Sequence, residues 1–115
     1  MTGSATIYHN PRCNTSRTAL KLIEESGAVP NVIRYLDTPP THDELRTLLA
    51  DAGLEPRQAV RHRESIYKDL GLADADAETL IAAMVQHPIL IERPIVVTEK
   101  GTVLARPAEK VLTVL

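Results

Sequence analysis

The 115-residue sequence contains a single cysteine and lacks phenylalanine and tryptophan. One cysteine cannot form a disulfide within the chain, and we find neither a signal peptide nor an apolar run near the roughly 18–20 residues of a membrane span. We therefore expect a cytoplasmic protein that does not enter a membrane. Of Phe, Trp and Tyr, only tyrosine occurs, at three positions, so the core must be aliphatic.

An excess of positive charge is also absent. The chain has 13 Lys and Arg against 15 Asp and Glu, and no basic tract is available to neutralise a nucleic-acid backbone. The four histidines, at positions 9, 42, 62 and 87, lack the spacing of metal ligands, so we expect no metal site. With 43% hydrophobic and 24% charged residues, the composition indicates one globular domain over residues 1–115.

The first part of the chain predicts a strand–helix–strand unit. The β-prone segment Ala5–Tyr8 ends before Asn10-Pro11, because proline keeps the preceding residue out of helical angles. Apolar residues then recur at helical spacing from Asn14 to about Glu25. A second strand is predicted over Asn31–Leu36, and the two strands of such a unit pair in parallel with a right-handed crossover.

The middle of the chain predicts helices. Thr41-His42-Asp43-Glu44 is a capping box, which starts a helix that ends at Gly53. Between Leu54 and Asp76 the pattern is weaker and predicts short helical segments. Residues Ala77–Gln86 show a clearer helical period. We expect this helical insertion to span about residues 41–88.

The last part of the chain predicts a hairpin followed by a helix. Two β-prone runs, Ile95–Thr98 and Val103–Arg106, flank a short loop that contains glycine. Pro107 ends the second strand, and Ala108–Leu112 is compatible with a closing helix. The order is therefore βαβ, then helices, then ββα, which predicts an α/β fold with a mixed central sheet.

Cys13 lies where the first predicted strand gives way to the first helix. A lone cysteine is more often a small buried side chain, but polar neighbours indicate that Cys13 is in an accessible loop. The first turn of a helix favours a thiolate through its free N–H groups and its dipole. Lowering a thiol pKa from about 8.5 to about 6 or 7 takes roughly 2–3 kcal/mol, whereas a helix end supplies about 0.3–1 kcal/mol. Hydrogen bonds from Thr15, Ser16 or nearby arginines must therefore contribute the rest.

Histidine and arginine residues are further candidates for the site. His9, four residues before Cys13, could act as a base, a charge partner or a hydrogen-bond support. Arg-Pro occurs at Arg93-Pro94 and again at Arg106-Pro107, and the planar fork of arginine suits tetrahedral oxyanions such as phosphate, sulfate or arsenate. Arg61 could join them from the helical segment. The alternative is that these are surface arginines beside structural prolines.

Motifs along the whole chain resemble the glutaredoxin-coupled bacterial arsenate reductases. They are Tyr8–Arg17, Tyr35–Thr41, Tyr67–Ala73, His87–Val97 and Arg106-Pro107. The resemblance implies a thioredoxin-like (glutaredoxin-like) fold with a helical insertion between its two halves. This agrees with the order of elements predicted above.

The resemblance also implies roles for individual residues. Cys13 is the nucleophile, and His9 and Ser16 support its thiolate. Pro94 matches a proline that is usually cis and lies beside the nucleophile, which would bring Arg93 towards Cys13. The residues implied to bind the oxyanion are Arg61, Arg93 and Arg106.

The implied reaction is the reduction of arsenate to arsenite without a bound cofactor. The Cys13 thiolate attacks arsenate, glutathione attacks next as co-substrate, and glutaredoxin reduces the intermediate so that arsenite leaves. The single cysteine is consistent with this scheme, because the second and third sulfurs must come from other molecules.

Two other functions stay open. Cys13-Asn14-Thr15-Ser16 is a C-x-x-S arrangement like that of monothiol glutaredoxins, which would fit a general glutathione-dependent thiol–disulfide oxidoreductase. Relatives with this fold also include adaptors that bind RNA polymerase and sense redox state through a C-x-x-C pair, but Ser16 excludes a two-cysteine switch here. The phosphatase-type arsenate reductases need a C-x5-R loop, and Ala19 occupies the arginine position.

Overall fold

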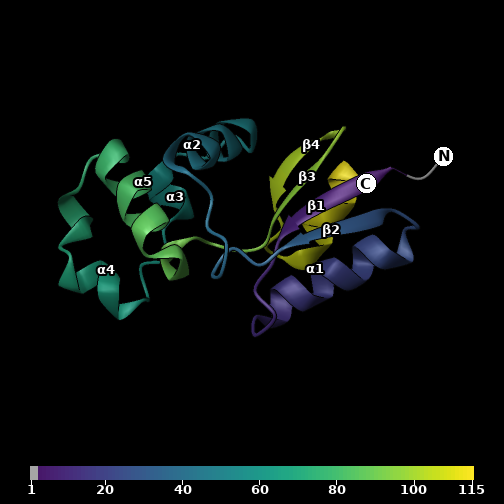
Figure 1. Ribbon diagram of the computed structural model, residues 1–115, viewed down its shortest axis with the longest axis horizontal. Helices are drawn as coiled ribbons and strands as arrows, with labels where there is room; N and C mark the ends of the chain where they lie inside the picture. Colours follow the sequence, from purple (N-terminus) through teal and green to yellow (C-terminus); the bar gives the residue numbers. More distant parts are fainter. Residues whose placement is uncertain (1–2) are drawn as a thin grey trace. The chain divides into compact units, whose positions relative to one another are not determined.

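The computed structural model describes residues 3–115, which fall into two compact units. The first unit holds the residues up to Thr38 together with Arg93–Leu115, and the second holds Pro39–Glu92. Figure 1 shows the elements of each unit. The expectations of one domain over residues 1–115 and of an insertion at about residues 41–88 stay predictions.

The first unit contains a four-stranded sheet in the order β2-β1-β3-β4. Strand β1 (Ser4–Tyr8) pairs in parallel with β2 (Val29–Ile33), and helix α1 (Asn14–Glu25) joins them. On its other side β1 pairs antiparallel with β3 (Ile95–Thr98), which forms a hairpin with β4 (Gly101–Leu104). The predicted βαβ unit, the hairpin and the mixed sheet are therefore confirmed (Figure 1).

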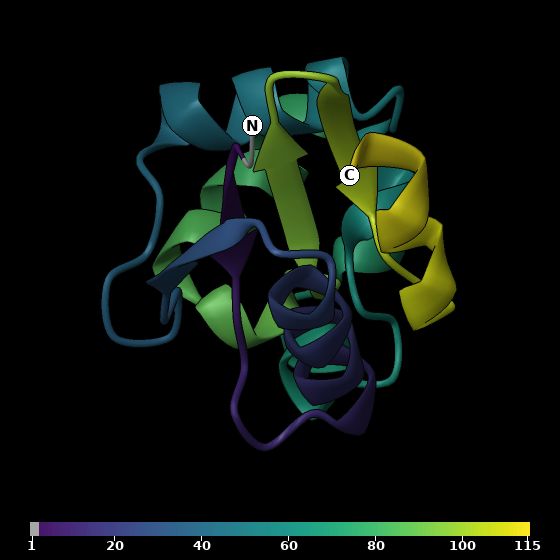
Figure 2. The same ribbon diagram turned by 90° about the vertical axis from the view of Figure 1, so that its right-hand side faces the viewer.

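One face of this sheet carries the core of the first unit. Helix α1 and the C-terminal 3-10 helix η3 (Ala108–Val114) lie on that face, side by side in both ribbon views (Figures 1 and 2). Ala5, Ile7 and Val96 point towards them, because alternate strand residues face the same side. From the two helices the buried side chains are Ala19, Ile23, Ala108, Val111 and Val114. The core cluster is aliphatic, as the composition predicts.

Two strands differ from their predicted bounds by more than one residue, and β1 begins one residue earlier than predicted, at Ser4. Strand β2 covers Val29–Ile33 rather than Asn31–Leu36, because the chain turns after Ile33: the N–H of Asp37 donates to the Arg34 carbonyl at 2.9 Å. Pro30 is accommodated because β2 is an edge strand, where a missing N–H need not interrupt a ladder.

Strand β4 covers Gly101–Leu104 rather than Val103–Arg106. Thr98 pairs with Gly101 across a two-residue loop, so the ladder begins directly at the glycine. The predicted closing helix is present as a 3-10 helix, and it runs to Val114 rather than ending at Leu112.

The second unit consists of short helices. They are α2 (His42–Asp51), α3 (Pro56–Ala59), α4 (Ser65–Asp69), η1 (Leu72–Asp74), α5 (Ala77–Gln86) and η2 (Pro88–Leu90). The predicted capping box is present: the Glu44 N–H donates to Thr41 Oγ1 at 3.1 Å, and the Thr41 N–H donates to Glu44 Oε1 at 2.9 Å. Gly53 follows α2 with a φ of 71°, a left-handed angle that glycine adopts without strain. Within residues 3–115 no helix has both the length and the apolar character needed to span a membrane.

Candidate active site

The register of the sheet brings distant parts of the sequence to one edge. Tyr8, the last residue of β1, pairs with Ile95, the first residue of β3. Ile95 pairs in turn with Leu104, the last residue of β4. Arg93 and Arg106 therefore lie at matching positions, each two residues beyond this last pair. They lie at the end of the sheet where β1 stops and the loop between β1 and α1 begins.

Cys13 occupies the N-cap position of α1 in that loop. Its N–H donates to the Asn10 carbonyl at 3.0 Å, and its own carbonyl accepts from the Arg17 N–H at 3.0 Å. The side chain is half-buried and forms no disulfide. No regular side-chain hydrogen bond closes the cap. The sulfur is therefore held at a helix start while part of it remains accessible to solvent.

Two arginines supply positive charge beside this sulfur. Arg106 Nη1 lies 3.9 Å from Cys13 Sγ and donates to the Arg93 carbonyl at 3.0 Å. Nε and Nη1 of Arg93 are shielded from solvent. The peptide bonds before Pro94 and Pro107 are both cis, and the sequence led us to expect only the first. The structure thus brings Arg93 and Arg106 together at Cys13.

These neighbours change the acidity of the thiol. Burial raises the pKa of Cys13, but the backbone N–H of Ser16, the hydrogen bonding and charge of Arg93 and the hydrogen bond from Arg106 outweigh it. The net result is a pKa below the ordinary value for cysteine. The helix start and the arginines therefore act together. This was expected from the sequence, because a helix end alone supplies less free energy than the thiolate requires.

His9 and Ser16 form a buried pair beneath the loop. Ser16 Oγ is 2.7 Å from His9 Nδ1 and accepts the Asn10 N–H at 3.0 Å. Burial, followed by the charges of Arg34 and Arg17, lowers the pKa of His9, so the imidazole is neutral at neutral pH. Of the three roles considered for His9, this geometry favours hydrogen-bond support of the loop over a charge partner for the thiolate.

Asn10 is a further organising residue that the sequence analysis missed. It is buried, its Oδ1 accepts the Arg12 N–H at 2.9 Å, and its carbonyl accepts the N–H of Cys13. Arg17 closes the loop from the other side by donating from Nη1 to the Pro11 carbonyl at 2.9 Å. An asparagine whose side chain accepts from the N–H two residues later forms an Asx turn. The Asn-Pro dipeptide is typical of such turns, so it could have predicted this role for Asn10.

Arg61 lies in the second unit. Its Nη1 is 3.1 Å from Glu92 Oε1, and both side chains are largely buried, with 11% and 16% of their area exposed. Its N–H donates to the Leu90 carbonyl at 2.7 Å. The structure therefore gives Arg61 a carboxylate partner, and its role in binding an oxyanion stays a prediction.

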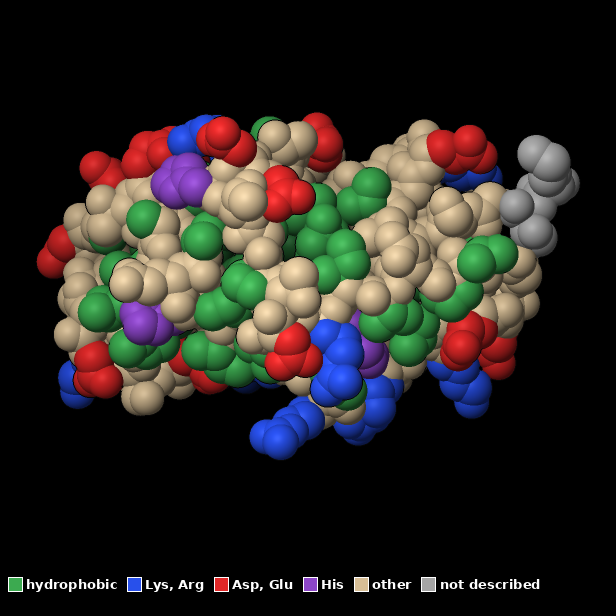
Figure 3. Space-filling model, in the orientation of Figure 1, with side chains coloured by type: hydrophobic (Ala, Val, Ile, Leu, Met, Phe, Trp, Pro, Cys, Tyr) green, Lys and Arg blue, Asp and Glu red, His purple; other side chains and the backbone are tan. Residues whose placement is uncertain are grey.

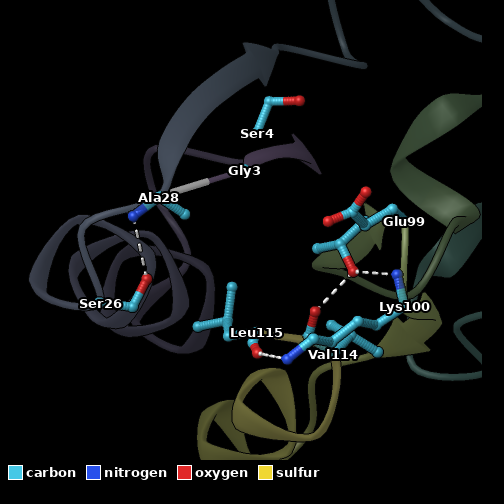
Figure 4. Close-up of a pocket in the computed structure, with 9 residues that line it drawn as sticks. Gly3, Ser4, Ser26, Ala28, Glu99, Lys100, Val114 and Leu115 are labelled. Carbon is cyan, nitrogen blue, oxygen red and sulfur yellow. Dashed lines mark hydrogen bonds between the residues drawn. The ribbon is translucent and has the colours of Figure 1, made fainter. Parts of the chain in front are cut away.

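A hollow at the opposite end of β1 differs in chemistry from the loop around Cys13. Ser4, Ser26, Lys100 and the C-terminal residues line it (Figure 4). Its polar groups already bond to one another, since Lys100 Nζ donates to the Leu115 carbonyl at 2.8 Å and Thr98 Oγ1 donates to the Val114 carbonyl. It contains no cysteine or histidine. By contrast, Lys and Arg side chains gather around the loop between β1 and α1 (Figure 3).

Comparison with known proteins gives consistent matches over the length of the chain. A profile of the ArsC family matches residues 8–114. An arsenate reductase of Yersinia enterocolitica is 55% identical over 112 residues, which are 96% of this chain and 79% of the relative. An arsenate reductase of Escherichia coli strain K12 is 54% identical over the same shares. The structure titled arsenate reductase from Vibrio cholerae has a TM-score of 0.94 at 45% identity and covers 100% of both chains.

These similarities agree with the fold described above. They confirm the α/β, thioredoxin-like fold that the sequence predicts. The extent of the family match and the identity to the curated relatives are both high. The chain belongs to the ArsC family.

Proposed function

We propose that this protein reduces arsenate to arsenite, with Cys13 as the nucleophile. The observation that carries the proposal is the pairing of Cys13 Sγ with Arg106 Nη1 at 3.9 Å, with Arg93 bonded to the same guanidinium. The chain is also 54–55% identical to proteins named arsenate reductase. A thiolate and an oxyanion repel one another, so a nucleophile of this kind needs local positive charge to approach its substrate.

In this proposal Arg93 and Arg106 bind oxygens of arsenate while the Cys13 thiolate attacks arsenic. A sulfur–arsenic bond forms, and one oxygen leaves as hydroxide or, after protonation, as water. The planar guanidinium forks suit the oxygens of a tetrahedral anion and offset the charge that develops on them. Arg61 is the third residue that we assign to the oxyanion.

Glutathione and glutaredoxin are proposed to complete the reaction. A glutathione thiolate displaces a second oxygen from arsenic, and a glutaredoxin thiolate then bonds to the glutathione sulfur. The bond between the glutathione sulfur and arsenic breaks, and its electron pair stays on arsenic, which is thereby reduced from arsenic(V) to arsenic(III) while glutathione and glutaredoxin form a disulfide. Water then displaces the Cys13 sulfur from arsenic(III), which releases arsenite and restores the Cys13 thiolate. Cys13 is the only cysteine in the sequence, so external thiols must supply these sulfurs. We place the reaction in the cytoplasm, where such thiols stay reduced.

A coupled assay tests the proposal. Purified protein is mixed with arsenate, glutathione, glutaredoxin, glutathione reductase and NADPH, and arsenate-dependent NADPH oxidation is followed. We expect turnover by the wild type and none by Cys13→Ser, with a known arsenate reductase as positive control. No turnover by the intact wild type would refute the assigned activity.

Arg93→Gln and Arg106→Gln separate this activity from general thiol–disulfide exchange. Both variants should lose most arsenate reduction, because each removes a cation from the oxyanion site. If the wild type instead reduces glutathionylated substrates, and does so equally well in both variants, the C-x-x-S arrangement serves thiol exchange and the arsenate proposal fails.

A further inference from the structure

A hollow lies beside the loop that carries Cys13. Residues 9–12, which follow β1, form one wall, and Arg34, Leu36 and Asp37, which follow β2, form the other. We refer to it as the loop hollow. It exists because β1 and β2 are parallel and end together, Tyr8 opposite Ile33. The space between the carboxyl ends of neighbouring parallel strands is a common location for ligands.

The loop hollow and the arginine pair lie on different sides of Cys13. In the sheet order β2-β1-β3-β4, the strand that leads to Cys13 has β2 on one side and β3 on the other. The hollow adjoins the β2 side, whereas Arg93 and Arg106 adjoin the β3–β4 side. A second reactant held in the hollow would therefore approach the sulfur without displacing an oxyanion from the arginines.

The lining of the hollow carries charge of both signs. Arg12 and Arg34 provide two exposed guanidinium groups, and Asp37 lies 3.5 Å from Arg34 Nε. The charge of Arg34 extends to His9, whose pKa it helps to lower. Leu36 adds an apolar surface that is 39% exposed. Arginine forks recognise carboxylates, and the exposed carboxylate of Asp37 beside them suits an ammonium group.

The size of the hollow suits a small molecule. Its volume is about 270 Å³, close to the lower end of the roughly 300–1,000 Å³ of ligand pockets. Arg12 precedes Cys13 directly in the chain, so the Cα atoms of the two residues are about 3.8 Å apart. A ligand that spans a few residues and is anchored at Arg12 or Arg34 can therefore present a thiol to the site.

We propose that the loop hollow binds the thiol co-substrate, a small peptide thiol with two carboxylates and one ammonium group, as in glutathione. Arg34 and Arg12 hold its carboxylates and Asp37 its ammonium group. The assignment rests on the proposed function, because that reaction requires an external thiol. It concerns binding alone and adds no chemical step.

Steady-state kinetics test the assignment. In the coupled assay, Arg34→Gln should raise the KM for glutathione about five- to tenfold, as expected for the loss of one charge-assisted contact at a partly exposed site. Charge reversal in Arg34→Glu should raise it further, while the KM for arsenate stays unchanged in both variants. Lys21→Gln removes the same charge from an exposed position on α1 and should change neither constant. An unchanged KM for glutathione in Arg34→Gln, or a raised KM for arsenate, would overturn the assignment.

Direct binding separates this inference from the proposed function. S-methylglutathione carries no free thiol, so its binding can be titrated without arsenate turnover by following the backbone amide resonances of the hollow. We expect shifts at residues 9, 10 and 12 in the wild type and at least fivefold weaker binding in Arg34→Gln. Binding that depends on Arg34 in a protein without arsenate turnover would reject the activity and support the hollow. Arsenate turnover, together with equal binding of S-methylglutathione by the wild type and Arg34→Gln, would support the activity and reject the hollow as the binding site.

Discussion

Replacing Arg106 with glutamine should raise the pKa of the Cys13 thiol. The substitution removes a guanidinium whose Nη1 lies 3.9 Å from Sγ. Two unit charges at about this distance attract by about 1 kcal/mol in a water-like dielectric and by about 4 kcal/mol at an effective dielectric of 20. Cys13 is half-exposed and the Arg106 charge is spread over its fork, so the lower figure applies. We therefore expect the pKa to rise, since the thiolate loses about 1 kcal/mol of attraction.

The pH dependence of alkylation by iodoacetamide measures this shift, because only the thiolate reacts at an appreciable rate. The midpoint should move to higher pH in Arg106→Gln, and the difference from wild type should shrink in about 1 M salt, where screening acts over about 3 Å. Arg12→Gln is the matched control. Arg12 is adjacent to Cys13 in the chain, yet it is not among the groups that lower the pKa of this thiol.

Two results would refute this reasoning. The midpoint of Arg106→Gln could coincide with that of the wild type, in which case the helix start alone activates Cys13. Alternatively, Arg12→Gln could shift the midpoint as far as Arg106→Gln does, in which case the general field of the basic loop decides the pKa rather than one contact at 3.9 Å.

Three further predictions concern the support of the loop and the second unit. Ser16→Ala removes the acceptor of the Asn10 N–H and the partner of His9, so urea denaturation should show a loss of about 1–3 kcal/mol; an unchanged unfolding free energy would contradict it. The pKa of His9 is lower in the folded state, so its contribution to stability is present above the unfolded value of about 6.5 and is lost as the pH falls towards the folded pKa. Acid should therefore destabilise His9→Gln less steeply than wild type between these pKa values, and equal slopes would count against a buried neutral imidazole. Thr41→Ala removes the cap of α2 and should cost about 1 kcal/mol in the same denaturation experiment, whereas Glu44→Gln, which keeps a capping-box residue, should cost less.

Elements that depend on near neighbours were predictable from the sequence. The capping box at Thr41 and the end of α2 before Gly53 involve contacts within a few residues, and the structure contains both. The βαβ unit and the hairpin follow from short periodic segments with clear turn signals between them. The placement of Cys13 at a helix start is local in the same sense.

The bounds of β2 and β4 were predicted wrongly because pairing partners set them. Residues 34–36 continue the β-prone pattern, but the pairing with β1 stops at Ile33, one residue before the Arg34–Asp37 turn. Gly101 has a low strand propensity and still joins the ladder, because Thr98 lies opposite it. The intrinsic strand propensity of a residue has a weaker effect than the hydrogen bonds that a neighbouring strand provides.

The sequence by itself determined the order of elements, the position of the thiol and the kinds of side chain available to it. Only the tertiary structure decided that Arg93 and Arg106 meet at that thiol and that a charged hollow lies on its other side. The reason is that both arrangements depend on register between strands more than 20 residues apart in sequence, which no local pattern of residues encodes. The same tertiary contacts bury His9 beside Ser16 and keep it neutral, so a residue that could have been a base or a cation becomes a support.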